Sequence, residues 1–248
     1  MIQDLSFLEK AHLFATLADV AYKDDCEQEF KDIGLTNYMF FDSQGAQGHA
    51  ASNRDDIIIS CRGTQPTKAN DLLADIDAIP KTHGSGFVHG GFRREARKIM
   101  GPIFNYIKRY PGRKIWLCGH SLGAAMATYI TQELEFASMN PTMLFTYGSP
   151  RVGSHDYVRD FHIEHHRFVN CNDAVTTVPF SAMGFKHHGT LHYINFYGNI
   201  RDLTSWQRFK DKWRAHWRSI KSGRLFDGIA DHSISLYAEK IKNIDPSK

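Results

Sequence analysis

The sequence predicts an α/β fold in which a central, mostly parallel β-sheet is flanked by helices. Short runs of β-branched and aromatic residues alternate along the chain with longer amphipathic segments, a pattern typical of parallel strands joined by crossover helices. One run, Ile57-Ile58-Ile59, is apolar without interruption, as expected of a strand buried on both faces. No repeat or Pro/Gly/Ser-rich linker divides the 248 residues, so we expect one domain over residues 1–248.

The first part of the chain supplies one helix followed by strands. Residues 6–22 place Phe7, Phe14 and Ala18 on one helical stripe, which predicts an N-terminal helix. Polar, glycine-bearing turns then separate three predicted strands, at residues 38–41, 48–52 and 56–61.

The rest of the chain alternates between the two kinds of element. Residues 92–110 predict a long helix that Pro102 should kink or restart. A buried strand is expected at 115–118, directly before a helix over 122–136. Further strands are predicted at residues 143–147, 167–170 and 191–197.

Charge and cysteine usage exclude several classes of protein. The formal net charge is only +3, from 30 basic and 27 acidic residues, which argues against a nucleic-acid binder. The cysteines, Cys26, Cys61, Cys118 and Cys171, lack metal-ligand spacing, so they predict no metal site. The N-terminus has no basic leader and no apolar run of membrane-spanning length. We therefore expect a cytoplasmic protein as encoded, although export without a cleavable signal is compatible with the sequence.

A Gly-x-Ser-x-Gly motif lies between the strand at 115–118 and the helix at 122–136. Its sequence is Gly119-His120-Ser121-Leu122-Gly123. In a nucleophile elbow, a serine lies on a strained turn between a strand and a helix, and the helix N-terminus faces the developing oxyanion. The alternative is a glycine-rich turn with an idle serine. The strand before and the helix after the motif favour Ser121 as a nucleophile.

Four further segments, in the same order along the chain, make the sequence resemble the class 3 (fungal-type) triacylglycerol lipases of the α/β-hydrolase superfamily. They are Arg62-Gly63-Thr64, Val88-His89-Gly90-Gly91-Phe92, Tyr147-Gly148-Ser149-Pro150-Arg151-Val152-Gly153 and Phe168-Val169-Asn170-Cys171-Asn172-Asp173. The resemblance implies an α/β-hydrolase fold with a short lid. It also implies hydrolysis of carboxylic esters through a Ser-His-Asp triad and an acyl-enzyme, a reaction for which we expect no metal and no cofactor.

The resemblance identifies Asp173 as the triad acid, and its position agrees, because Asp173 follows a predicted strand. Asp156 is the alternative, although its position after a turn favours a role at the start of a helix. The triad order requires a histidine after Asp173. The candidates are His187, His188, His192, His216 and His232. His232, before a short terminal helix, matches the family best, and His187 and His188 are the main alternatives.

Two backbone donors are expected to form the oxyanion hole. The N–H of Leu122 is the generic donor, since Leu122 follows the nucleophile. The resemblance assigns the second donor to Thr64. His89-Gly90-Gly91 is similar to the oxyanion motif of other esterases, but its place at a helix start favours a packing role. We also interpret His120 as a packed neighbour of the nucleophile.

Two segments bear on the substrate. The family's lid falls between Thr64 and Phe87, where residues 65–71 are polar, and this favours short or medium acyl chains. Residues 205–224 place Phe209 and Trp213 on the apolar stripe of a basic helix, which either packs on the protein body or lies on an anionic lipid surface.

The sequence thus predicts a lipase or esterase that acts on acylglycerols or on short- and medium-chain esters. Phospholipids and feruloyl-type aryl esters remain alternative substrates. An inactive protein that docks on membranes is the alternative from another class. The joint presence of Ser121, Asp173, His232 and Thr64 argues against it.

Overall fold

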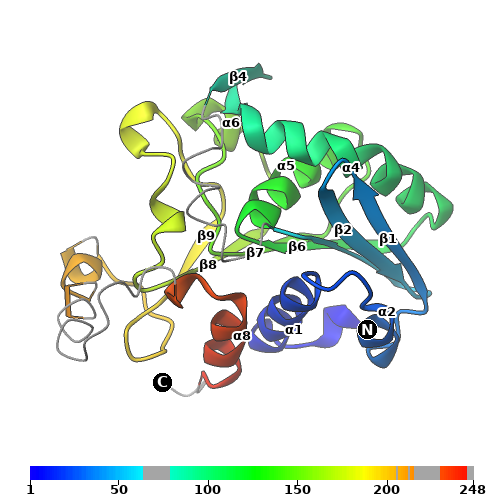
Figure 1. Cartoon of the computed structure of the whole chain (residues 1–248), viewed down its shortest axis with the longest axis horizontal. Helices are drawn as coiled ribbons and strands as arrows, with labels where there is room; N and C mark the ends of the chain where they lie inside the picture. The colour runs from blue at the N-terminus through cyan, green and yellow to red at the C-terminus, as the bar shows by residue number, and fades with distance from the viewer. Residues whose placement is uncertain (64–78, 205, 212, 215–229, 245–248) are drawn as a thin grey trace.

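A seven-stranded β-sheet, in the order β1-β2-β3-β6-β7-β8-β9, forms the centre of the described part of the chain (Figure 1). The computed structural model describes residues 1–63, 79–204, 206–211, 213–214 and 230–244. The strands are β1 (Asn37–Ser43), β2 (Ala46–Ser52), β3 (Asp56–Cys61), β6 (Lys114–His120), β7 (Met143–Tyr147), β8 (His165–Asn170) and β9 (Thr190–Ile194). From β3 to β9 the neighbours pair in parallel, whereas β1 and β2 are antiparallel additions. The predicted mostly parallel sheet is confirmed, and its parallel strands place their carboxyl ends at one edge.

Helices cover both faces of this sheet. On one face, α1 (Phe7–Val20) and α8 (Ile234–Lys242) pack against each other, and on the other face α4 (Gly90–Arg109) packs against α5 (Leu122–Phe136). The shorter elements are α2 (Glu27–Asp32), α6 (His155–Arg159) and the 3-10 turns η1 (Ile2–Asp4), η3 (Val175–Thr177), η4 (Ser181–Met183) and η5 (Ala230–His232). A hairpin of β4 (Pro80–His83) and β5 (Gly86–His89) lies outside the main sheet.

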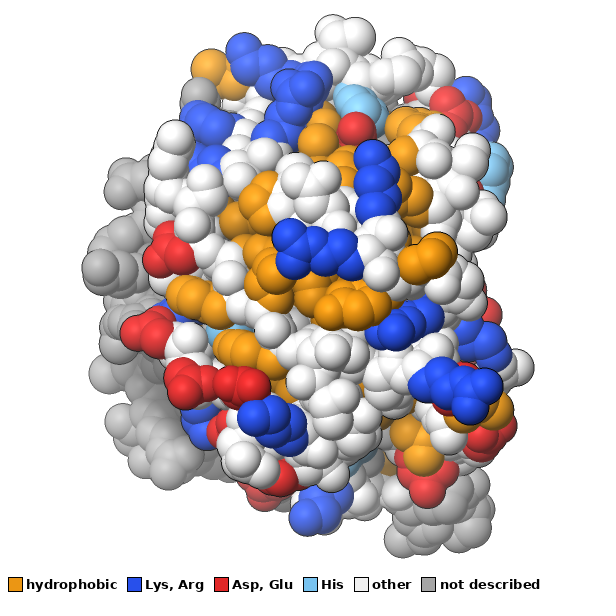
Figure 2. Space-filling view, turned by 90° about the vertical axis from the view of Figure 1, so that its right-hand side faces the viewer, with side chains coloured by type: hydrophobic (Ala, Val, Ile, Leu, Met, Phe, Trp, Pro, Cys, Tyr) orange, Lys and Arg blue, Asp and Glu red, His pale blue; other side chains and the backbone are white. Residues whose placement is uncertain are grey.

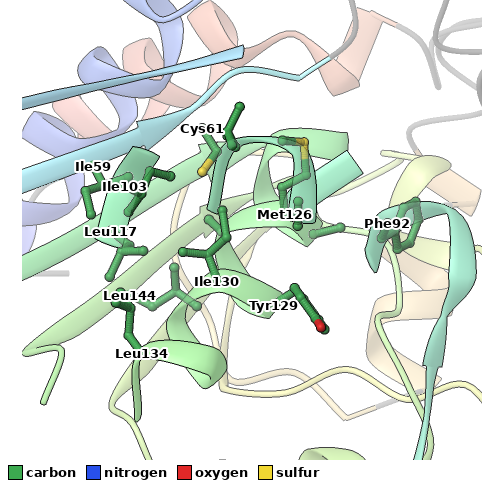
Figure 3. Packing of buried hydrophobic residues seen from close by; sticks show 14 of the residues in the cluster. Ile59, Cys61, Phe92, Ile103, Leu117, Met126, Tyr129, Ile130, Leu134 and Leu144 are labelled. Atoms are coloured by element: carbon green, nitrogen blue, oxygen red, sulfur yellow. The ribbon is translucent and has the colours of Figure 1, made fainter. Parts of the chain in front are cut away.

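A buried apolar layer lies between the sheet and each pair of helices. Figure 3 shows Ile59, Leu117 and Leu144 of three neighbouring strands opposite Ile103 of α4 and Ile130 of α5. The second layer joins α1 and α8 to the opposite face. Burying each side chain of this size contributes about 1.5–3 kcal/mol, so the two layers fix the sheet edge that carries the site.

Local signals explain where several elements begin and end. Ser6 caps α1 through a reciprocal pair of hydrogen bonds with Glu9. Pro102 was expected to kink or restart the helix, and the restart is wrong, because α4 continues through it. Gly101 precedes the proline and has no Cβ for the ring to crowd. The last strand stops at Ile194 rather than residue 197, since Asn195 accepts the backbone N–H of Tyr197 in a turn.

The basic segment expected at 205–224 is helical at residues 206–211 and 213–214. The packing hypothesis is wrong for its described aromatic residues, because Phe209 is 56% exposed and Trp213 is 54% exposed. Their ring stacks on each other and on Trp206 hold the aromatic side together at the surface. Residues 215–224 lie outside the described part of the chain.

The surface at the β1 side of the molecule mixes apolar and basic side chains. Figure 2 shows hydrophobic side chains interspersed with Lys and Arg on this side. Near β2, Arg113 donates to Ser52 Oγ at 2.8 Å and lies over the ring of Tyr110 at 4.3 Å. Charges around an edge strand such as β1 oppose pairing with another sheet.

Among the described helices, none has the length and apolar character needed to cross a membrane.

Candidate active site

Ser121 occupies a strained turn between β6 and α5. Its backbone angles, φ 58° and ψ −128°, lie in a region that non-glycine residues rarely adopt. The turn is so tight that a Cβ on Gly123 would lie 2.2 Å from the Cys61 carbonyl oxygen, and one on Gly119 would lie 2.4 Å from the Gly123 oxygen. The two glycines of the motif are therefore required by space. The arrangement is that of a nucleophile elbow, with the serine at the start of a helix.

Asp173 and His232 form a fully buried pair. Asp173 follows β8, and His232 lies in η5 directly before α8. The His232 Nδ1 atom lies 3.0 Å from Asp173 Oδ1 and 2.9 Å from Oδ2. Because a carboxylate only accepts hydrogen bonds, this contact places the imidazole proton on Nδ1. The backbone N–H of Val175 donates to Oδ1 at 2.9 Å and helps to orient the carboxylate.

The second ring nitrogen of His232 is available for chemistry. Nε2 is buried and has no hydrogen-bond partner among the described residues. Ser121 belongs to the same corner of the fold, since its N–H donates to the Tyr147 carbonyl at 3.1 Å. Gly148, the next residue, packs so closely that a Cβ would lie 2.7 Å from Asp173 Oδ2 and 2.9 Å from His232 Nδ1. The structure thus brings the elbow beside an Asp–His pair with a free nitrogen.

Tyr237 supports the pair and was missed by the sequence reasoning. Its hydroxyl donates to Asp173 Oδ2 at 2.6 Å and accepts the Asn170 backbone N–H at 2.9 Å. Burial, reinforced by the charge of Asp173, holds the pKa of Tyr237 well above its usual range, so the hydroxyl remains a donor. Tyr237 lies in the second turn of α8, and no spacing signal in the sequence distinguishes it from a core tyrosine.

His120 fixes the backbone of His232. Its Nε2 donates to the His232 carbonyl at 2.6 Å, and its Nδ1 accepts the Tyr22 hydroxyl proton at 2.8 Å. Burial, together with the neighbouring His232, holds the pKa of His120 well below its usual range. A neutral ring with one donor and one acceptor fits both contacts. The expected packed neighbour of Ser121 therefore also positions the loop that carries His232.

The alternative triad histidines make other contacts. His187 donates from Nε2 to the Thr176 carbonyl at 2.9 Å. His188 donates to the Phe161 carbonyl at 2.9 Å, and its other nitrogen contacts His165. His192 contacts His166 at 3.0 Å. Among the described residues, none of these rings has a hydrogen bond or ion pair to an aspartate, and His216 lies outside the described part of the chain.

The other residues weighed from the sequence have structural roles. Asp156 lies in the first turn of α6 and pairs with Arg159 at 3.1 Å, as expected for a helix start. His89 is the N-cap of α4, where its ring accepts the Phe92 N–H and stacks on the Phe92 ring. The packing role expected for His89 is confirmed. All four cysteines are free and buried.

The expected oxyanion donors are partly within the described residues. Leu122 is the first residue of α5, where the N–H has no intrahelical acceptor. Thr64 lies outside the described residues. Its neighbour Gly63 packs on the elbow, since a Cβ there would lie 2.6 Å from the His120 carbonyl oxygen. Gly63 therefore lies directly beside the elbow.

Known proteins resemble both the sequence and the fold. The family model for class 3 lipases matches residues 58–183. The lipase of Rhizomucor miehei is 29% identical over 184 residues, covering 68% of this chain and 50% of that protein. The toxin TseL of Vibrio cholerae is 29% identical over 174 residues, covering 68% of this chain and 27% of that protein. The chain thus spans half or less of the length of these curated relatives.

Solved structures give the same result. Lipase II from Rhizopus niveus superimposes with a TM-score of 0.65 at 26% identity, covering 75% of this chain and 80% of that one. A triacylglycerol lipase whose structure is described as having a serine protease triad superimposes with a TM-score of 0.66 at 24% identity, over the same shares. The α/β-hydrolase fold expected from the sequence is confirmed. The chain belongs to the class 3 lipase family.

Proposed function

We propose that this chain hydrolyses carboxylic esters through an acyl-enzyme on Ser121. The observation that carries the proposal is the fully buried Asp173–His232 pair beside the strained elbow, with His232 Nε2 free. Family membership and relatives named as lipases support the same class of reaction. A buried nitrogen without a hydrogen-bond partner lowers the stability of the fold by about 1–3 kcal/mol. Such a cost is typical of an active site, where the nitrogen must be free to accept a proton during the reaction.

The mechanism follows from the positions of these groups. His232 Nε2 accepts the Ser121 proton as Ser121 Oγ attacks the ester carbonyl carbon. Asp173 holds the imidazole tautomer and stabilises the imidazolium that forms. The Leu122 N–H, and Thr64 as second donor, bind the tetrahedral oxyanion. His232 then protonates the departing alcohol, and water repeats the sequence on the acyl-enzyme.

The substrate class is tested with p-nitrophenyl esters from acetate to palmitate. We expect turnover by the wild type and a loss of several orders of magnitude in Ser121→Ala and in His232→Ala, since the members of a triad act as a unit. The chain-length optimum separates an esterase from a lipase. If Ser121→Ala lost turnover but His232→Ala did not, His187 or His188 would be the general base instead of His232. Absence of turnover on soluble and emulsified esters would favour the inactive binding protein.

We further propose that the segment 206–214 contacts lipid surfaces. Trp206, Phe209 and Trp213 are 62%, 56% and 54% exposed and stack on one another. Lys210 lies over the Trp206 ring at 5.2 Å, so positive charge borders the aromatic side. Aromatic rings with flanking basic residues suit the interface of an anionic bilayer.

Polar contacts hold this segment with its aromatic side outward. Asp211 is buried and accepts hydrogen bonds from the Tyr193 hydroxyl at 3.2 Å and the Phe196 N–H at 2.9 Å. The Cys171 thiol also donates to Asp211, at 3.2 Å. Asp211 therefore attaches the inner side of the segment to the protein, and the aromatic rings on its outer side stay exposed.

Sedimentation with vesicles of phosphatidylglycerol and phosphatidylcholine tests this contact. We expect Trp213→Ala to weaken binding several-fold and Phe136→Ala to leave it unchanged. Phe136 is the matched control, since it is similarly exposed, at 54%, but lies at the end of α5. Equal binding by the wild type and Trp213→Ala would contradict the proposed contact.

A further inference from the structure

A pocket of about 380 Å³ lies between the β8–β9 end of the sheet and the segment 206–214. Val169 and Leu191 line it from the sheet, Thr176 and Thr177 from η3, and Phe209 from the aromatic segment. Its volume falls in the range of small-molecule sites. Of the described residues that line it, none is an aspartate or a glutamate.

Three arginines, Arg151, Arg167 and Arg208, line this pocket. Arg167 comes from β8 and is only 8% exposed, yet its Nε has no hydrogen-bond partner among the described residues. No described carboxylate forms an ion pair with it. Burial lowers the pKa of Arg167 to about 10, and the charges of Arg151 and Arg208 act in the same direction. A buried guanidinium in this situation is costly unless an anion joins it.

The described residues around Arg151 and His187 offer neutral partners rather than an anion. The Arg151 Nη1 atom donates to the Thr177 carbonyl and, at 2.8 Å, to the Pro179 carbonyl, so neutral oxygens hold this side chain. Burial and the charge of Arg167 keep the pKa of His187 well below its usual range, so His187 adds no charge. The Tyr193 hydroxyl donates at 3.2 Å to Asp211, a buried carboxylate that is not among the described lining residues. The described lining of the pocket therefore carries arginine side chains and no carboxylate, around the largely buried Arg167.

We propose that Arg151, Arg167 and Arg208 form a binding site for a phosphate group, carried by a lipid headgroup or by a soluble phosphate compound. Guanidinium groups match phosphate oxygens in a bidentate geometry, and several cations favour a phosphate over a singly charged carboxylate. The site adjoins the triad through η3, where Thr176 donates to the Asp173 carbonyl at 2.9 Å. Phe209 connects it to the exposed aromatic segment.

Urea denaturation in sodium phosphate, with ionic strength held constant by sodium chloride, tests the site without requiring catalysis. Wild type, Arg167→Met, Arg208→Gln and the control Arg54→Gln are compared. Arg54 is exposed and lies between β2 and β3, so its replacement removes the same charge far from the pocket. We expect the wild-type midpoint to rise with phosphate concentration, since a ligand that binds only the folded state stabilises it.

The variants decide between specific and general effects of phosphate. We expect Arg54→Gln to follow the wild type, and Arg167→Met to lose the dependence through a roughly thirtyfold or greater loss of affinity. Arg208, which is half-buried, provides a second variant whose folding does not depend on filling a buried site. Equal phosphate dependence in all four proteins, or none in the wild type, would overturn the proposal.

A second arm identifies the source of the phosphate. In Ser121→Ala, which prevents turnover, dihexanoyl phosphatidic acid is compared with inorganic phosphate and with dihexanoylglycerol. A larger rise of the midpoint with phosphatidic acid, lost in the Ser121→Ala/Arg167→Met double variant, assigns the site to a lipid phosphate. Equal rises with the two phosphates assign it to soluble compounds. A rise with dihexanoylglycerol that equals the phosphatidic acid effect would show that the phosphate is not recognised.

Discussion

Replacement of Tyr237 by phenylalanine tests whether the triad acid depends on a third group. The change removes one hydroxyl, which donates to Asp173 Oδ2 at 2.6 Å and accepts the Asn170 N–H at 2.9 Å. A hydrogen bond to a charged group contributes about 1.5–3 kcal/mol, and an unpaired buried N–H costs about 1–3 kcal/mol. We therefore expect the free energy of unfolding to fall by roughly 2.5–6 kcal/mol.

The effect on catalysis follows from when the Asp173 charge matters most. The imidazolium of His232 forms in the transition state, and a misplaced carboxylate stabilises it less well. A loss of about 1.5–3 kcal/mol at that point corresponds to a roughly 10- to 100-fold lower kcat. KM should be nearly unchanged, because Tyr237 is buried behind Asp173 and contacts no substrate. Steady-state hydrolysis of a soluble p-nitrophenyl ester measures both constants.

Tyr106→Phe is the matched control for this change. The Tyr106 hydroxyl is also buried. It donates to the Asn37 carbonyl at 2.5 Å and lies 2.9 Å from Ser52 Oγ, with which it also forms a hydrogen bond. It lies in α4, so its loss should lower stability and leave kcat as in the wild type. If Tyr237→Phe lost stability but kept the wild-type kcat, the hydroxyl would be structural only and the reasoning would be refuted.

Two further predictions concern stability. Gly148→Ala should lower both stability and kcat, since its Cβ would lie 2.7 Å from Asp173 Oδ2. Gly84→Ala is the control, because Gly84 has a similar positive φ and nothing within 4 Å of the added Cβ. In denaturation experiments the control should lose only about 1 kcal/mol of unfolding free energy. Burial lowers the pKa values of His188 and His192 to about 4, below about 6.5 in the unfolded chain. The unfolded chain then binds more protons, so the free energy of unfolding should fall between about pH 6.5 and 4, by up to about 2.7 kcal/mol per pH unit. Equal unfolding free energies at pH 7 and 5 would contradict this.

Much of the fold could be predicted from local patterns. The continuous apolar runs around Ile58 and Trp116 marked the two central strands, because parallel strands buried on both faces need no alternation. Helix α2 and the β4–β5 hairpin were not predicted as elements, and of α6 only a helix start at Asp156 was expected, since a few residues carry too little periodicity. The pairing of β4 with β5 also depends on the rest of the fold.

Some residues of the candidate site could likewise be predicted from the sequence, and others could not. Ser121 could be identified because its neighbours along the chain carry the steric requirement of the elbow. Asp173 and His232 meet across 59 residues, and their identification needed the family resemblance. Tyr237 and Arg167 had no sequence signal, because their significance lies in partners, or in missing partners, that only the folded chain brings together.

Covalent labelling with a p-nitrophenyl alkylphosphonate, followed by peptide mass spectrometry, tests the role of Ser121 most directly. This reagent gives a stable analogue of the tetrahedral intermediate on an activated serine. We predict one adduct per chain, located on Ser121, with release of one equivalent of nitrophenol and much slower labelling of His232→Ala. An adduct on another residue, or equal labelling rates in the wild type and His232→Ala, would contradict catalysis by Ser121 with His232 as its base.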